Sequence, residues 1–170
     1  MGVYQIRKYG DPILRTRCRR VESVGMRERK ILQQMAKTMY KAQGIGLAAP
    51  QVGIDLQLIV VDLGDNNPLK LVNPLILLRE GDSVLEEGCL SLPEVMVRVR
   101  RSKRVMVESW NENGETVKVE GEDLLAHIIQ HEIDHLSGIL IIDRADPRNT
   151  MSLDTKLKLL EKTAGNHMKL

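Results

Sequence analysis

Apolar residues recur along this chain at two different spacings, and each change of spacing marks a predicted element. Over residues 24–42 they return every three or four positions, which predicts a helix. Gly44 follows closely and is a typical residue for ending it. The same helical spacing returns over residues 122–137, where Gly138 follows, and again over residues 152–163. The pattern therefore predicts a helix near each end of the sequence and another in its second half.

Between the first two helices the pattern changes to that of short strands. Apolar runs or alternation of apolar and polar residues occur at 57–63, 74–78, 83–86, 95–101, 103–110 and 115–120. The last two segments flank Asn113-Gly114, a dipeptide typical of a tight hairpin turn. This order of elements indicates an α+β fold. We expect mostly antiparallel short strands and sheets packed around a central helix at 122–137, with an N-terminal and a C-terminal helix.

Composition limits which residue types can fill the core and indicates where in the cell the protein works. The 170 residues suit a single domain, and with no Phe and only 2% aromatic residues the core must be aliphatic. A net charge of +2 is too small to indicate nucleic-acid binding. The first residues lack the apolar segment of a signal peptide, and no apolar run approaches the roughly 18 residues of a membrane span. We expect a cytoplasmic protein with reduced thiols at Cys18 and Cys89, and neither membrane nor DNA as a partner.

The predicted central helix carries the sequence His131-Glu132-Ile133-Asp134-His135, in which two histidines lie four residues apart. Side chains at this spacing share one helix face, so both imidazoles can reach a single metal ion. Glu132 is offset by one position and can hold a water on that metal. The alternative is a solvated helix face. The apolar residues around the motif indicate a buried helix instead, where an unpaired carboxylate costs several kcal/mol.

A catalytic metal site needs a third protein ligand and a position that stays open. A longer protease pattern, with another histidine six residues after the second, fails because Ile141 stands there. Asp143, Asp154 and Glu161 are alternatives in polar segments downstream. Cys89 is the better candidate, since a thiolate is a soft, strong ligand for a borderline metal ion. A lone cysteine can instead be a small buried apolar residue, and this is the interpretation that we keep for Cys18.

Three further polar residues near the motif have structural interpretations. On a helix, His127 lies too far from His135 to join the same site, so we place it at the pocket rim or on the surface. Asp134 faces away from the two histidines and is expected to bind a side chain behind the site or to pair on the surface, rather than to bind the metal. Glu87 is expected to pair with Arg101 and so to fix the loop that carries Cys89.

Three segments, in this order and spacing, closely resemble the signature motifs of the bacterial peptide deformylase family. They are GIGLAAPQ at 44–51, EGCLSLP at 87–93 and QHEIDHL at 130–136. The resemblance runs from about residue 3 to residue 147 and is weaker beyond it, where the family varies. It implies an enzyme that removes the N-formyl group from the initiator methionine of nascent polypeptides and releases formate. On this basis residues 1–170 form one catalytic domain with a variable C-terminal part from about residue 148.

By the family pattern, Cys89, His131 and His135 bind one divalent metal ion and a water fills the fourth position. Glu132 then acts as the general base and afterwards as the general acid. The resemblance favours Fe²⁺ in the cell, with Zn²⁺, Ni²⁺ or Co²⁺ able to occupy the site. Ligand type alone suits either Fe²⁺ or Zn²⁺.

The same pattern assigns the groups that contact the substrate. Gln51 and the backbone N–H of Leu90 stabilise the oxyanion, which a primary amide can do without adding charge. The backbone at Gly46 binds the main chain of the substrate. The walls of an apolar slot for the methionine side chain are Ile45, Leu85, Leu124 and Ile128.

Besides the N-formylmethionyl nascent peptide, the ribosome is a possible partner, and two basic segments are candidates for that contact. The run RVRRSKR at 98–104 is either the solvated face of strands or a contact with ribosomal RNA. The resemblance also implies that the C-terminal segment works near the ribosomal tunnel exit, and this segment is mildly basic here.

Two other functions use the same helix. A zincin-like endopeptidase would take a different third ligand and cut internal peptide bonds. A binding module with a structural metal would need four protein ligands, and the sequence offers three good ones. Gln51 and Cys89, each within its motif, favour the deformylase over the endopeptidase.

Overall fold

The computed structural model describes residues 2–145 and 150–167, and within them the chain forms three α-helices and seven strands. The helices are α1 (Met26–Lys41), α2 (Asp123–Leu136) and α3 (Thr150–His167). The strands are β1 (Gly46–Ala48), β2 (Leu58–Val61), β3 (Leu69–Glu80), β4 (Ser83–Cys89), β5 (Leu92–Arg101), β6 (Arg104–Trp110) and β7 (Thr116–Glu122). Single 3-10 turns are η1 (Pro12–Arg15), η2 (Ala49–Val52) and η3 (Ile141–Arg144). The α+β prediction is confirmed.

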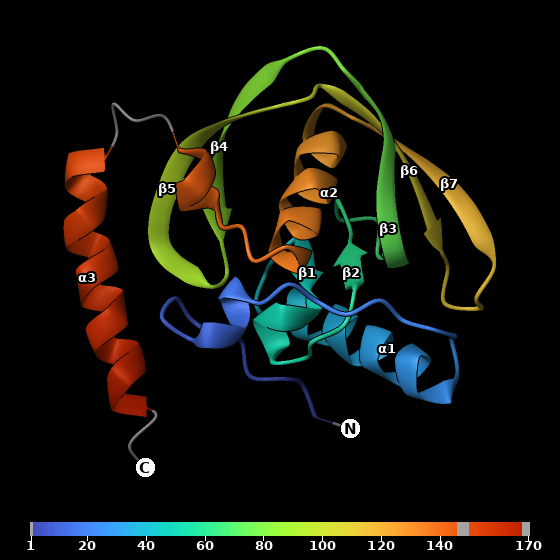
Figure 1. The fold of residues 1–170 in the computed structure, drawn as a ribbon, viewed down its shortest axis with the longest axis horizontal. Coiled ribbons are helices and arrows are strands. Elements are labelled where there is room, and N and C mark those ends of the chain that lie inside the picture. Colours follow the sequence, from blue (N-terminus) through green and yellow to red (C-terminus); the bar gives the residue numbers. More distant parts are fainter. Residues whose placement is uncertain (1, 146–149, 168–170) are drawn as a thin grey trace.

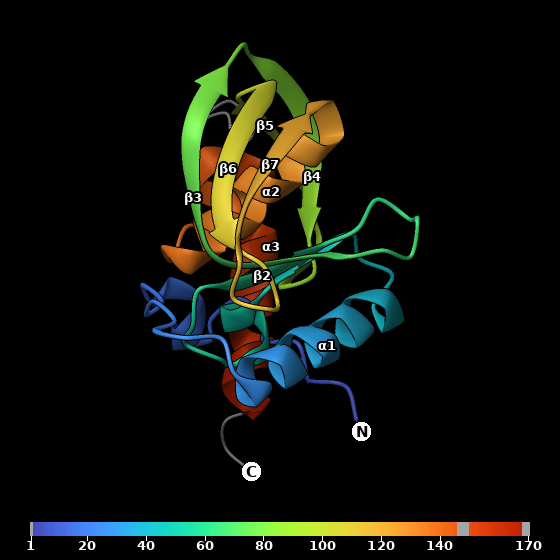
Figure 2. The same ribbon diagram turned by 90° about the vertical axis from the view of Figure 1, so that its right-hand side faces the viewer.

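Two antiparallel sheets enclose α2. Five strands pair in the order β1-β2-β3-β6-β7, and β4 and β5 form a separate two-stranded sheet. Figures 1 and 2 show α2 between these layers, with β4 and β5 on one side and β3, β6 and β7 on the other. The helix predicted to be central therefore lies at the centre, where its polar face can be shielded from water on both sides.

The burial of α2 explains why its sequence mixes apolar and polar residues. Nine of its 14 residues are buried. Its apolar side chains, among them Ile129, pack on the five-stranded sheet, and its histidines turn toward β4. The helix ends at Leu136, and Gly138 follows it with a left-handed φ of 71°. A hypothetical Cβ at Gly138 would lie 2.6 Å from the backbone oxygen of Arg15. Glycine is therefore needed there both for its backbone angle and for close packing.

The strands differ from the sequence prediction chiefly in length. β3 runs over 12 residues, whereas only 74–78 was predicted, and the three-residue β1 was not predicted at all. Pro74 cannot donate a ladder hydrogen bond, and it lies where the register of β3 against β6 shifts between Val72 and Leu75. A bulge thus accommodates a proline that interrupts the apparent pattern. β1 is too short to show a period of its own.

The core is aliphatic, as composition predicts. One cluster joins α1 to β1 and β2, a second joins α2 to the five-stranded sheet, and a third joins β5 to α3. Cys18 belongs to the second cluster and is buried; this burial raises the pKa of its thiol to about 12. The interpretation of Cys18 as a small buried apolar residue is therefore confirmed. Among the described residues no helix has both the length and the hydropathy that crossing a membrane requires.

Candidate metal centre

The end of β4 and one face of α2 meet at three potential metal ligands. Cys89 Sγ lies 3.4 Å from Nε2 of His135, and that nitrogen lies 3.2 Å from Nε2 of His131. One ligand atom of each residue falls within 4.8 Å of the others. Atoms bound to one tetrahedral ion, at about 2.0–2.1 Å for nitrogen and about 2.3 Å for sulfur, stand roughly 3.3–3.6 Å apart. The two separations at His135 Nε2 therefore already lie close to those around a single ion.

The protonation of the two histidines also points to a cation at this place. Burial lowers the pKa of His135 well below its ordinary value, and the nearby His131 adds to that effect. Burial also acts to lower the pKa of His131, but hydrogen bonds to Cys89 and Glu87 outweigh it and raise this pKa. Without a metal the pair therefore favours one charged ring beside one neutral ring. A divalent ion can take the place of that proton and accept both lone pairs.

Behind the ligands lies a buried ion-pair network. Both oxygens of Glu87 accept hydrogen bonds from Arg101, at 2.6 and 3.0 Å, and Oε2 lies 3.1 Å from Nδ1 of His131. Arg101 also donates to Asp134 at 2.8 Å, and Arg144 donates to Asp134 at 2.9 Å. The predicted pairing of Glu87 with Arg101 is thus present, and Asp134 binds neighbours as expected. The bond that Glu87 accepts keeps the proton of His131 on Nδ1 and leaves Nε2 free to ligate.

Glu132 is buried next to the cluster and is incompletely hydrogen-bonded. Its Oε2 has no hydrogen-bond partner among the described residues. Its Oε1 faces Gly46, where a Cβ would come within 2.3 Å of that oxygen. Burial raises the pKa of Glu132 to about 7, although the charges of His131 and Arg101 act to lower it. A carboxyl group with this pKa can both take up and release a proton near neutral pH.

Gln51 is held with its amide NH₂ toward the cluster. Its Oε1 accepts a hydrogen bond of 2.9 Å from the backbone N–H of Ala48, which leaves Nε2 on the other side. Nε2 donates to Ser91 Oγ at 3.2 Å and lies 3.5 Å from Cys89 Sγ. The turn η2 carries Gln51 and buries it almost fully. A donor fixed in this way is already oriented for a negatively charged oxygen beside the thiol.

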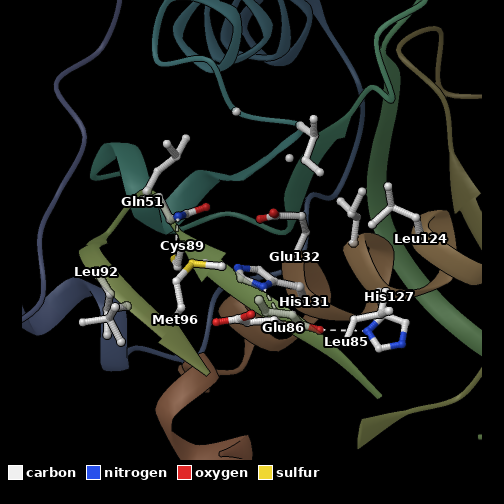
Figure 3. Close-up of a pocket in the computed structure, with 18 of the residues that line it drawn as sticks. Gln51, Leu85, Glu86, Cys89, Leu92, Met96, Leu124, His127, His131 and Glu132 are labelled. Carbon is white, nitrogen blue, oxygen red and sulfur yellow. Dashed lines mark hydrogen bonds and ion pairs between the residues drawn. The ribbon is translucent and has the colours of Figure 1, made fainter. Parts of the chain in front are cut away.

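A cavity of about 440 Å³ opens beside the cluster. Figure 3 shows Gln51, Cys89, His131 and Glu132 gathered at one side of it, with Leu124 on the other. Leu90, which follows Cys89, also lines it. So do all the residues that were predicted to contact the substrate, namely Ile45, Gly46, Leu85, Leu124 and Ile128.

Residues of β5 complete the cavity, and sequence reasoning missed them. Leu92, Val95 and Met96 all line it because β5 pairs with β4 and folds back over the site. A hypothetical Cβ at Gly88 would lie 2.8 Å from the Met96 sulfur, so the two strands meet closely there. The alternating pattern of 95–101 predicted a strand but gave no sign of the neighbouring strand or cavity that it faces.

Of the two places expected for His127, the pocket rim agrees with the structure and the surface does not. This residue is 2% exposed, although it does contribute to the cavity wall. Its Nδ1 lies 3.0 Å from Glu87 Oε1, and its Nε2 lies 2.5 Å from Ser83 Oγ. Both ring nitrogens therefore have partners on β4, which is why a polar ring can be buried here. As expected, His127 does not belong to the three-ligand cluster.

The basic run 98–104 is largely neutralised by neighbouring acids. Arg101 is buried in the network described above, and Arg104 pairs with Glu80 and Glu120. Arg100 pairs with Asp82 at 3.2 Å. Most of this run therefore serves ion pairs within the protein, and its charge toward a polyanion is smaller than the sequence alone indicates.

The family model described as polypeptide deformylase matches residues 3–151. A peptide deformylase of Thermotoga maritima is 45% identical over 162 residues, which cover 95% of this chain and 98% of that protein. One of Clostridium botulinum is 51% identical over 144 residues, covering 85% and 97% of the two chains. The crystal structure of the peptide deformylase from Thermus thermophilus superimposes with a TM-score of 0.90 at 38% identity, over 95% of this chain and 99% of that one.

Glu87 gives the stability of the metal-free protein a pH dependence of defined sign. Burial acts to raise its pKa, but hydrogen bonds from His131 and Arg101 outweigh burial and bring the pKa from 4.5 down to about 2. Because the folded-state pKa is the lower one, Glu87 stabilises the fold at and above about pH 5, and this contribution of ~3 kcal/mol is lost as the pH falls toward about 2. Urea unfolding of wild type and Glu87→Gln across this range measures the contribution. A difference between them that stays constant with pH would contradict it.

Proposed function

Because this chain belongs to the polypeptide deformylase family, we propose that Cys89, His131 and His135 hold the metal ion with which it deformylates nascent polypeptides. The enzyme is a metallohydrolase that removes the N-formyl group of new chains. The observation that carries the proposed ligand set is the convergence of one sulfur and two imidazole nitrogens within 4.8 Å at the wall of a cavity. A single metal ion fits this set of donors.

Cys89, His131 and His135 would hold the metal ion, and this ion would supply Lewis acidity for the formyl carbonyl and would lower the pKa of a water molecule toward neutrality. Glu132 supplies the proton transfers. Its pKa of about 7 suits it to take a proton from the attacking water and to pass it to the nitrogen of the leaving amine. The oxygen of Glu132 that has no partner among the described residues is available for this transfer.

Two donors are proposed to stabilise the negative charge on the former formyl oxygen. The amide of Gln51 is pre-oriented by the hydrogen bond that its own oxygen accepts from Ala48. The backbone N–H of Leu90 follows the thiol directly in the chain. Both donors bind the negatively charged oxygen more strongly than the neutral formyl oxygen of the substrate, because a hydrogen bond to a charged acceptor is stronger. Neither donor carries a full charge of its own.

The apolar part of the cavity is proposed to receive the methionine side chain. Leu124 and Ile128 come from α2, Leu85 comes from β4, and Ile45 precedes β1. The hydrogen at Gly46 in place of a side chain leaves room for the substrate backbone beside Glu132. Because this slot lies next to the proposed ligands, a formylmethionine can place its side chain in the slot and its formyl group at the metal.

The endopeptidase alternative is not favoured. Its third ligand would lie downstream of the two histidines, but Asp143 is bound to Arg15 and to the backbone of Leu140. Asp154 and Glu161 are exposed on α3. The thiol of Cys89 occupies the position beside the imidazoles that a third ligand needs.

We also infer that residues 1–170 act as one cytoplasmic catalytic domain with α3 as its C-terminal part. Leu153, Leu157 and Leu160 of α3 pack on the cluster that contains Leu92 and Val95, which themselves line the cavity. The proposed location follows from the substrate, because formylated chains emerge from ribosomes in the cytoplasm.

Replacing Glu132 tests the proposed proton transfer. In Glu132→Gln, formate release from a formyl-Met peptide should fall by roughly 10²–10⁴-fold while metal content stays at one ion per chain, since the ligands are untouched. Glu22→Gln, the same change at an exposed site, is the control. A chelator should abolish activity in the wild type, and an unformylated peptide should remain uncut. Formate release by Glu132→Gln within threefold of wild type would remove the proposed role.

The metal is proposed to be Fe²⁺ in the cell, with Zn²⁺, Ni²⁺ or Co²⁺ able to replace it. A thiolate and two imidazoles suit each of these ions, so availability decides among them. Protein purified without oxygen should contain about one iron per chain and lose activity in air, because O₂ oxidises Fe²⁺ and the thiolate of Cys89 bound to it. The Ni²⁺-loaded form should keep its activity, because Ni²⁺ is not readily oxidised by O₂. Anaerobic protein that contains only zinc would contradict the assignment.

The ribosome is proposed as a partner through α3. Lys158 and Lys162 are exposed four residues apart on this helix, whereas most of the run 98–104 is paired with acids. Cosedimentation with ribosomes at low salt should weaken severalfold in the double variant Lys158→Glu, Lys162→Glu, because phosphate contacts depend on charge. Unchanged cosedimentation would refute this contact.

A further inference from the structure

His127 lies one helical turn before the proposed ligand His131, on the same face of α2. The two rings meet the same carboxylate: His127 Nδ1 lies 3.0 Å from Glu87 Oε1, and His131 Nδ1 lies 3.1 Å from Glu87 Oε2. On its far side, His127 Nε2 lies 2.5 Å from the hydroxyl of Ser83, the first residue of β4. A hydrogen-bonded chain thus runs from Ser83 through His127 and Glu87 to His131.

The carboxylate of Glu87 fixes the direction of its hydrogen bonds to the two histidines. An ionised carboxylate only accepts, so both histidines must donate from Nδ1 to Glu87. On the other side of the ring, Nε2 of His127 meets the Ser83 hydroxyl, which can donate to this nitrogen or accept from it. In His131 the same rule leaves Nε2 directed at the metal cluster, where a metal ion would take the place of its proton. One pattern of protons therefore satisfies all four residues.

Glu87 reaches its full number of partners only with His127 in place. Arg101 donates one hydrogen bond to each of its oxygens, and His131 and His127 each add one more. A carboxylate has about four acceptor sites, so these four donors leave none over. Without His127, Oε1 would keep Arg101 alone, and the carboxylate could turn away from the orientation that aligns the ring of His131.

We propose that His127 is a positioning residue for the metal centre, acting through Glu87 to hold the imidazole of His131 in its ligating orientation. The inference rests on the proposed ligand role of His131. It is separate from a role in substrate binding, which the presence of His127 in the cavity wall would also allow. Groups that orient a ligating histidine typically change metal affinity by roughly 10–100-fold. Because His127 acts one residue further away, we expect a change of about tenfold, at the low end of that range.

The experiment measures Co²⁺ binding by competition with a chromophoric chelator, together with the visible spectrum of the Co²⁺ protein. His127→Leu removes both hydrogen bonds and should bind Co²⁺ about tenfold more weakly, with an altered spectrum. His127→Asn keeps an N–H near the position of Nδ1 and should return the affinity to within about threefold of wild type, whereas His127→Gln places its amide one carbon further out and should not.

Two controls separate positioning from its alternatives. Leu124→Ala changes the cavity wall without touching Glu87, and should raise the KM for a formyl-Met peptide while leaving Co²⁺ affinity unchanged. Thermal unfolding of each metal-free variant reports stability independently. If His127→Leu does not fold, the comparison of His127→Asn with His127→Gln carries the test.

The outcomes distinguish this inference from the proposed function. Wild-type protein that bound no Co²⁺ at Cys89, judged by the absence of a thiolate band in the spectrum, would overturn both. Wild-type binding with equal Co²⁺ affinity in His127→Leu, or with equal affinities in His127→Asn and His127→Gln, would overturn the positioning role alone. A rise in KM without a change in Co²⁺ affinity would assign His127 to the substrate instead.

Discussion

A single buried carboxylate, that of Glu87, joins the three elements on which the site depends. It lies on β4, accepts hydrogen bonds from Arg101 on β5, and meets two histidines on α2. Burying an ion costs several kcal/mol unless nearby partners compensate it, and here each oxygen has two donors. The packing of α2 against the small sheet is therefore tied to the orientation of a proposed ligand. A change that separates these layers would disturb both.

Two carboxylates in the site have opposite properties because their surroundings differ. Glu87 has four donors and a pKa lowered to about 2, so it remains ionised. Glu132 is buried with one oxygen unpartnered among the described residues, and its pKa is raised to about 7. The first suits a fixed negative charge that holds a ring in place, and the second suits a group that moves a proton. Residue type is the same in both cases, and hydrogen bonding decides the difference.

Local periodicity predicted the elements whose patterns extend over a full turn or several alternations. The three helices and the hairpin of β6 and β7 follow from such patterns. β1 is too short for any period, and the length of β3 is concealed by Pro74. In the site, the four-residue spacing of His131 and His135 predicted their convergence. The place of Cys89 beside them was indicated by its motif, because no local rule connects β4 with α2. The burial of His127 was missed for the same reason: its partners lie on a strand about forty residues earlier, where helical spacing gives no information.

The proposed ligands come from two parts of the chain that are synthesised at different times. Cys89 ends β4, whereas His131 and His135 belong to α2, which follows β5, β6 and β7. During its own translation this protein exposes the thiol first and cannot complete the cluster until the central helix has left the ribosome. A chain interrupted before that point holds at most one of the three proposed donors. Maturation of the enzyme is in this sense a late event in its own biogenesis.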